Sequence, residues 1–284
     1  MSPRLALRAA PPGQLVAIGT DDGPDLPAFV YVPRQLRPDA PMLVSVHGYT
    51  RNALSHAIRF RGLADRHGAV CVVPCFSHSR HRRYQQLAPG IGGEAPDAAL
   101  CGLLDLVADA RRLQERPAAW FGFSGGGQFV HRFALRHPHR VAAAAIAAPG
   151  WYTFPDAGTD WPRGLRVTEG APRPDIEALL GIPLLVLVGD RDTQQEALLN
   201  CSPEIVAQQG SHRLERAERW VSAMRAAAAA RGLPAKVTLE RLRGAGHSFE
   251  SATDRYNMLR LVSNHLFPVA GAHLRSPQPT MEAT

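Results

Sequence analysis

The chain has 284 residues, of which 45% are hydrophobic and 20% are charged, with a formal net charge of +7 and an isoelectric point of about 9.8. This length and ordinary composition exclude a disordered protein and fit one α/β domain over residues 1–284. No stretch approaches the roughly 20 apolar residues of a membrane span, so we expect no membrane partner.

The basic balance does not indicate a nucleic-acid partner. Lys236 is the only lysine, and the arginines are spread along the chain with a modest cluster at residues 80–83. Because no basic stripe is interleaved with aromatic residues, we expect no nucleic-acid binding. We interpret Arg80, Arg82 and Arg83 as solvated surface rather than as a site for an acidic part of a substrate.

The cysteines are too few and too scattered for a disulfide framework, so we expect reduced thiols: Cys71, Cys75, Cys101 and Cys201. Pro-Pro-Gly at residues 11–13 interrupts the N-terminal region before an apolar run of signal-peptide length accumulates. A cytoplasmic protein is therefore expected. Cys71, Cys75, His78 and His81 superficially resemble a zinc site, but Cys71 falls in a predicted buried strand, where cysteine behaves as a small apolar residue. We expect no metal.

Short apolar or β-branched runs alternate with longer amphipathic stretches, which is typical of a parallel sheet with helices on both faces. Most runs are almost continuously apolar, as burial on both faces requires, whereas the last alternates as an edge strand would. The predicted strands are residues 42–48, 69–74, 118–124, 141–148, 183–190 and 236–242. The predicted helices are residues 53–68, 97–115 and 128–138, and one that Ser211 caps and that ends at Gly232. Residues 273–284 have few core side chains and are predicted to fray.

The connection over residues 149–181 is longer than most loops in compact domains. It is rich in proline, and its aromatic residues argue against disorder. We interpret it as a lid or as a wall of a substrate pocket, in preference to a surface excursion. Trp151, Tyr152 and Trp161 are the expected substrate contacts, although they could simply pack the loop against the domain.

A Gly-x-Ser-x-Gly motif, residues 122–126, lies where a predicted strand ends and a predicted helix begins. This is the context of a nucleophile elbow, in which a sharp turn holds Ser124 in a strained conformation and lifts its hydroxyl clear of the sheet. Side chains two positions on either side would collide with neighbouring backbone, which explains Gly122 and Gly126. The segment lacks the lysine and the spacing of a phosphate-binding loop.

A serine hydroxyl needs a histidine to accept its proton and a carboxylate to orient that histidine. Asp190 and Asp192 follow one buried strand and His247 follows the next, so these loops should meet Ser124 at the carboxyl edge of the sheet. We choose Asp192 over Asp190, because a residue beyond the strand end can turn toward the histidine.

An acyl-transfer site also needs donors for the oxyanion. The amide of Gly125, which follows the nucleophile, is expected to supply one. The loop after the first central strand, residues 47–50, should supply the other, with the amide of Tyr49 as first choice and that of Thr50 as the next.

The motifs HGYT, GFSGG, GDRD and GAGHSF occur in this order across residues 42–250, and through them the chain resembles the α/β-hydrolase superfamily. Within it, the chain is similar to serine esterases such as polyhydroxybutyrate depolymerases and feruloyl esterases. The resemblance implies an α/β-hydrolase fold and an esterase-like reaction with Ser124, Asp192 and His247 as the triad.

We therefore expect a serine esterase that cleaves a small or medium carboxylic ester through an acyl-enzyme intermediate, without a cofactor. A peptidase or amidase on the same fold would use the same triad and stays an alternative. A non-catalytic ligand-binding protein of this fold is a second alternative, although such a protein would need only the pocket.

Overall fold

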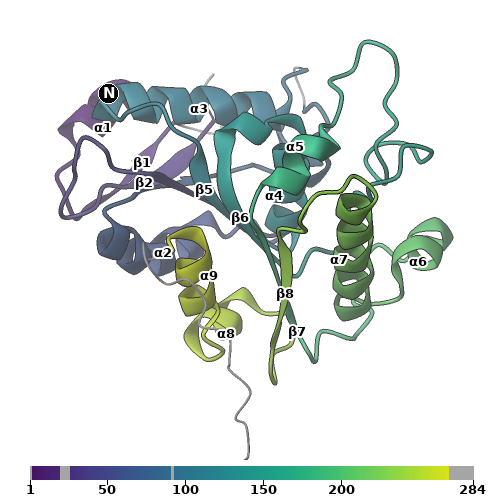
Figure 1. Cartoon of the computed structure of the whole chain (residues 1–284). Coiled ribbons are helices and arrows are strands. Elements are labelled where there is room, and N and C mark those ends of the chain that lie inside the picture. Colours follow the sequence, from purple (N-terminus) through teal and green to yellow (C-terminus); the bar gives the residue numbers. More distant parts are fainter. Residues whose placement is uncertain (1, 20–25, 91–92, 269–284) are drawn as a thin grey trace, which may run out of the picture.

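A mostly parallel, eight-stranded sheet runs through the centre of the described chain (Figure 1). The computed structural model describes residues 2–19, 26–90 and 93–268, so the predicted frayed tail lies outside the described residues. The strands are β1 (Leu15–Ile18), β2 (Ala28–Tyr31), β3 (Met42–Val46), β4 (Val70–Pro74), β5 (Ala118–Phe123), β6 (Val141–Ala147), β7 (Leu184–Gly189) and β8 (Val237–Leu242). Their order in the sheet is β1-β2-β4-β3-β5-β6-β7-β8.

The strands from β3 to β8 pair in parallel, and β2 pairs antiparallel with both β1 and β4. Every residue of β4, β5 and β7 is buried, because helices cover both faces of the sheet. By contrast, β8 at the edge is buried only at its two ends, with exposed or half-buried residues between them. All six strands predicted from the sequence are present, with ends within two residues of those predicted, and the α/β fold class is confirmed.

Helices pack on both faces of the sheet (Figure 1). One apolar core lies beneath side chains of α1, α3, α4 and α7, and the other lies beneath side chains of α2, α8 and α9. The helices are α1 (Pro3–Ala9), α2 (Ala53–His67), α3 (Pro96–Arg111), α4 (Gly125–Arg136), α5 (Ile176–Gly181), α6 (Pro203–Gln209), α7 (Arg213–Ala229), α8 (Phe249–Asp254) and α9 (Met258–Leu266), with short 3-10 turns η1 (Tyr84–Gln86) and η2 (Pro138–Arg140). Among the residues described, no helix is both long and apolar enough to cross a membrane.

The start of α7 differs from the prediction by one residue. Its N-cap is His212, whose Nδ1 accepts the amide of Glu215 at 3.3 Å. Ser211 instead donates its own backbone amide to the Glu215 carboxylate at 2.7 Å. The Glu215 side chain therefore closes the turn before the helix. The helix ends at Ala229, three residues before Gly232.

Candidate active site

Ser124 occupies a sharp turn between β5 and α4. Its backbone has φ 53° and ψ −113°, a region that a residue with a side chain rarely adopts and that a tightly packed turn must enforce. A Cβ at Gly122 would collide with the carbonyl of Gly126, and a Cβ at Gly126 would collide with the carbonyl of Val46. The two glycines therefore allow the backbone to pass close enough to its neighbours to lift Ser124 to the end of the sheet.

Ser124, His247 and Asp192 form a continuous chain of hydrogen bonds. His247 Nε2 lies 3.1 Å from Ser124 Oγ, and His247 Nδ1 lies 2.7 Å from Asp192 Oδ2. With the Nδ1 proton donated to the carboxylate, Nε2 is left to accept the hydroxyl proton. Asp190 accepts the amide of Gly244 at 2.7 Å, so it ties the loop before His247 instead of contacting the imidazole.

The buried carboxylate of Asp192 has a second partner that the sequence reasoning missed. Nη1 of Arg213, at the start of α7, donates to Asp192 Oδ1 at 3.1 Å, and Nη2 donates to Glu196 at 3.0 Å. The side chains of Asp192 and Arg213 are 2% and 4% exposed. Both carboxylate oxygens of Asp192 are thus occupied, which fixes the plane in which it meets the histidine.

The backbone amides of Gly125 and Tyr49 lie close together beside the nucleophile. A Cβ at Gly125 would lie 3.3 Å from the amide nitrogen of Tyr49, so the two residues are adjacent. Within the described residues, neither amide donates to another backbone group. Gly125 is also the first residue of α4, whose N-terminal dipole favours negative charge. This arrangement suits an oxyanion hole of the kind expected from the sequence.

The buried ring of His47 orients the peptide between Gly48 and Tyr49. Its Nδ1 lies 2.9 Å from the Gly48 carbonyl, and its Nε2 accepts the amide of Phe76 at 3.1 Å. Burial lowers the pKa of His47 to about 4, so the ring is neutral at pH 7 and Nδ1 carries the proton. The amide of Arg51 donates to the same carbonyl at 3.0 Å. Because the carbonyl of a trans peptide points away from its N–H, these contacts also fix the direction of the Tyr49 amide.

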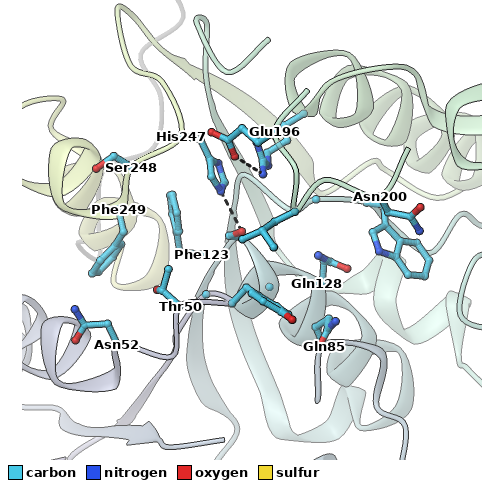
Figure 2. Close-up of a pocket in the computed structure, with 18 of the residues that line it drawn as sticks. Thr50, Asn52, Gln85, Phe123, Gln128, Glu196, Asn200, His247, Ser248 and Phe249 are labelled. Carbon is cyan, nitrogen blue, oxygen red and sulfur yellow. Dashed lines mark hydrogen bonds and ion pairs between the residues drawn. The ribbon is translucent and has the colours of Figure 1, made fainter. Parts of the chain in front are cut away.

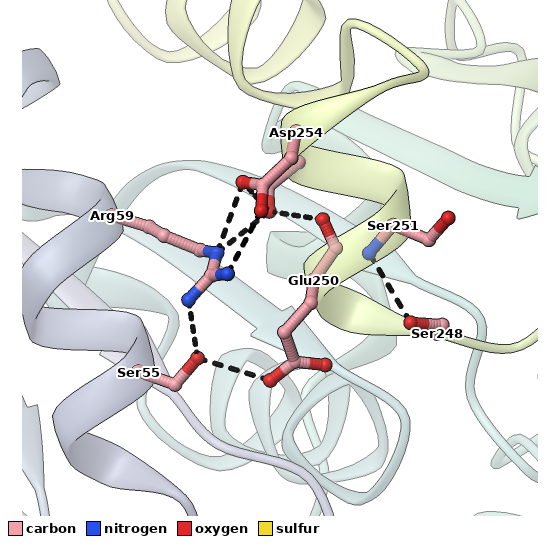
Figure 3. A network of polar contacts seen from close by, with 7 residues as sticks. Ser55, Arg59, Ser248, Glu250, Ser251 and Asp254 are labelled. Atoms are coloured by element: carbon pink, nitrogen blue, oxygen red, sulfur yellow. Dashed lines mark hydrogen bonds and ion pairs between the residues drawn. The ribbon is translucent and has the colours of Figure 1, made fainter.

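A polar network joins α2 to α8, the helix that begins two residues after His247 (Figure 3). Arg59 on α2 donates to both carboxylate oxygens of Asp254, at 3.1 and 2.9 Å, and to Ser55 Oγ at 2.7 Å. Ser55 in turn donates to Glu250 at 3.0 Å. The helix that follows His247 is thereby held against α2, on the same face of the sheet.

A pocket of about 440 Å³ opens above Ser124, within the usual range for small-molecule sites. Figure 2 shows Asn52, Ser248 and Phe249 at one end of it and Gln85, Gln128 and Asn200 at the other.

The structure brings one of the three predicted aromatic contacts to this pocket. Trp151 lines it. Tyr152 is fully buried, with its ring stacked on Trp220 at 4.8 Å. Trp161 packs against the guanidinium of Arg136 at 4.8 Å. The expectation that Tyr152 and Trp161 line the pocket is therefore not met, because both rings are used in packing behind it.

Residues 150–153, of which Gly150 and Trp151 line the pocket, are fixed in place through their backbone. Buried side chains from α4, α6 and α7 form hydrogen bonds with their backbone. Gln209 accepts the N–H of Tyr152 and donates to its carbonyl. His131 accepts the N–H of Thr153, Trp220 donates to the Thr153 carbonyl, and Arg216 donates to the Gly150 carbonyl. This stretch fits the pocket-wall interpretation of residues 149–181. A lid function for the residues that follow stays a prediction.

Within residues 2–19, 26–90 and 93–268, no group of three or more His, Cys, Asp or Glu side chains could hold a metal ion. Cys71 is fully buried in β4, and burial raises the pKa of its thiol to about 12.

Comparison with known proteins gives matches among solved structures only; no family model and no curated protein matches the chain. A poly(3-hydroxybutyrate) depolymerase from Bordetella parapertussis is 30% identical, with 93% of each chain covered and a TM-score of 0.76. A poly(aspartic acid) hydrolase from Sphingomonas sp. KT-1 is 26% identical over 90% of this chain and 98% of its own, with a TM-score of 0.75. An S-formylglutathione hydrolase from Agrobacterium tumefaciens shares the fold at 18% identity, 89% and 94% coverage, and a TM-score of 0.57.

Proposed function

The chain belongs to the α/β-hydrolase superfamily, and from that premise we propose that it is a serine esterase acting on small or medium carboxylic esters. The observation that carries the proposal is the chain of hydrogen bonds from Ser124 through His247 to Asp192, at 3.1 and 2.7 Å. A pocket of about 440 Å³ supports a substrate of that size.

In the reaction, His247 Nε2 takes the hydroxyl proton as Ser124 Oγ attacks the ester carbonyl carbon. The amides of Gly125 and Tyr49 hold the oxyanion of the tetrahedral intermediate. When that intermediate collapses, the C–O bond to the alcohol breaks and His247 returns the proton to the alcohol. Water, deprotonated by His247, then attacks the acyl-enzyme, and the acid leaves as Ser124 regains its proton.

Amide hydrolysis is the second candidate, favoured by the 26% identity to a poly(aspartic acid) hydrolase. A polyanionic substrate has less support. Arg213 is the only arginine or lysine among the residues that line this pocket, and it already donates to Asp192 and Glu196. The similarity to a poly(3-hydroxybutyrate) depolymerase supports an ester bond as the target.

The test is hydrolysis of p-nitrophenyl esters from acetate to decanoate by the wild type and by Ser124→Ala, with the matched p-nitroanilides beside them. Labelling with a fluorophosphonate is mapped by mass spectrometry. Label on Ser124, with ester turnover lost in the variant, is the expected result. Anilide turnover equal to ester turnover would favour an amidase. Absence of label and of turnover would favour a non-catalytic binding protein.

A further inference from the structure

Gln128 lies one helical turn after Ser124 on α4. Its main-chain amide donates to the Ser124 carbonyl at 3.0 Å, and its side chain, in a residue only 8% exposed, lines the pocket (Figure 2). Ser124 lines the same pocket, so the carboxamide shares that pocket with the nucleophile. The proposed reaction has no use for it.

Arg132 fixes which end of this carboxamide faces the pocket. Its guanidinium is fully buried, lies 4.1 Å from the ring centre of Trp151, and donates to Gln128 Oε1 at 3.3 Å. It also donates to the Gln85 carbonyl at 2.5 Å and to Thr153 Oγ1 at 3.0 Å, which hold it in place. A guanidinium carries donors and no acceptor. The oxygen of the carboxamide must therefore face Arg132, and its NH₂ group must point away.

The NH₂ group of Gln128 is left without a protein acceptor. A Cβ at Gly150, another pocket-lining residue, would lie 3.0 Å from Gln128 Nε2, so glycine at this position leaves room for the amide. Among the described residues, Gln128 Nε2 makes no hydrogen bond, yet it is not one of the unpartnered atoms that are fully buried. The nitrogen is therefore accessible, and because Gln128 lines the pocket, its N–H groups face that pocket. The Gly150 carbonyl nearby is occupied by Arg216 at 2.6 Å.

We propose that Gln128 selects substrates with a second oxygen acceptor, a carbonyl or ether oxygen separate from the scissile ester. This inference rests on the proposed function and adds a substrate class to it. In the free protein, water can occupy the position of that oxygen. A methylene group there would displace the water without replacing its hydrogen bond, whereas an oxygen would restore the bond. We expect about a tenfold difference in kcat/KM between such a pair.

The test compares esters of equal length that differ only in one atom or group. The oxygenated esters carry an ether or keto oxygen at successive positions of either the acyl or the alcohol chain, and each is measured against its hydrocarbon counterpart. Gln128→Met removes both the donor and the acceptor. Gln128→Glu keeps an oxygen toward Arg132 but presents an acceptor to the pocket.

Asn200→Leu is the control. Asn200 also lines the pocket, but it is exposed, and its Oδ1 accepts the amide of Ser202 at 3.0 Å instead of facing a buried cation. The wild type and Asn200→Leu should prefer at least one oxygenated ester about tenfold. That ratio should fall to near one in both Gln128 variants.

Binding provides a readout that does not depend on turnover. The dissociation constants of N-methylpentanamide and N-methyl-4-oxopentanamide, with further keto positions, are measured on Ser124→Ala and on Ser124→Ala combined with Gln128→Met. A preference for an oxygenated amide that Gln128→Met removes supports the inference even if no ester is hydrolysed. Equal binding and equal turnover for every oxygen position, or a preference unchanged in Gln128→Met, would overturn it while leaving the esterase proposal intact.

Discussion

Arg213 donates a hydrogen bond from Nη1 to Oδ1 of Asp192 at 3.1 Å, and both side chains are buried. Removing one partner of a buried ion pair leaves a charge without compensation. The pair comes from the loop after β7 and the first residue of α7, so it ties the orientation of the carboxylate to the position of a helix.

Arg213→Met is expected to lower the free energy of unfolding by about 3 kcal/mol. It should also lower kcat/KM, because Asp192 loses the contact that sets its plane. Urea denaturation and ester kinetics measure the two effects. Arg219→Met, on an exposed face of the same helix, is the control and should change stability by no more than about 0.5 kcal/mol. Equal stability and equal kcat/KM in the two variants would show that Arg213 does not support Asp192.

Gly126→Ala and Gly62→Ala should have opposite effects. A Cβ at Gly126 would strike the backbone at Val46, which costs about 3 kcal/mol or prevents folding. A Cβ at Gly62, within α2, meets nothing within 4 Å, and alanine favours the helix by about 0.5–1 kcal/mol. Thermal unfolding of both variants is the measurement. A stable, active Gly126→Ala protein would contradict the close approach at the elbow.

Stability should fall as the pH is lowered from about 6.5 toward 4. The pKa of buried His47 is about 4, against 6.5 for an ordinary histidine, so in this range the unfolded chain binds a proton that the folded protein does not. The stabilisation is present above pH 6.5, and about 3 kcal/mol is lost over the full window. Burial also holds the pKa of His56 and of His131 well below 6.5, which acts in the same direction.

Urea midpoints measured between pH 7.5 and 4.5 would show this loss. His47→Gln, which can still donate to the Gly48 carbonyl and accept from Phe76 but does not titrate there, should make the dependence less steep, leaving the contributions of His56 and His131. A variant as sensitive to pH as the wild type would mean that His47 does not contribute.

Trp151→Ala should change the ranking of p-nitrophenyl esters by acyl length, because its ring lines the pocket. Trp161→Ala should leave the ranking unchanged, because that ring packs against Arg136. Kinetics across the acetate-to-decanoate series distinguish the two. An equal loss of activity on every ester of the series in Trp151→Ala would show that Trp151 only packs the pocket wall and does not select acyl length.

Much of the fold could be predicted because its central strands are apolar on both faces. The segments that became β3 to β7 are short, almost continuously apolar runs between amphipathic stretches, which is what a parallel sheet between two helical layers demands, and the polar residues of β8 indicated an edge strand. β1 and β2 were missed. They are four residues each and pair antiparallel at the edge, where neither burial nor length imposes a clear pattern.

The order of motifs indicated Ser124, Asp192 and His247, because each follows a buried strand and the ends of parallel strands share one edge. Arg213 and Gln128 could not be found in the same way. Arg213 is 21 residues from its partner and looks like any arginine on a helix. Gln128 becomes informative only when the buried cation beside it is known. Likewise, nothing in the sequence separates Trp151 from Trp161, since each ring packs against an arginine of α4 that the sequence does not pair with it.

The backbone of residues 150–153 is bonded to side chains of three helices, whereas the turns that follow carry no comparable set of buried contacts from those helices. An insertion or deletion within the first stretch would leave several buried donors and acceptors without partners at once. Further along the same connection, a change in length would disturb fewer such bonds. Descendants of this protein should therefore differ by substitutions within residues 150–153 and by changes of loop length in the rest of the connection. The two regions can then evolve independently.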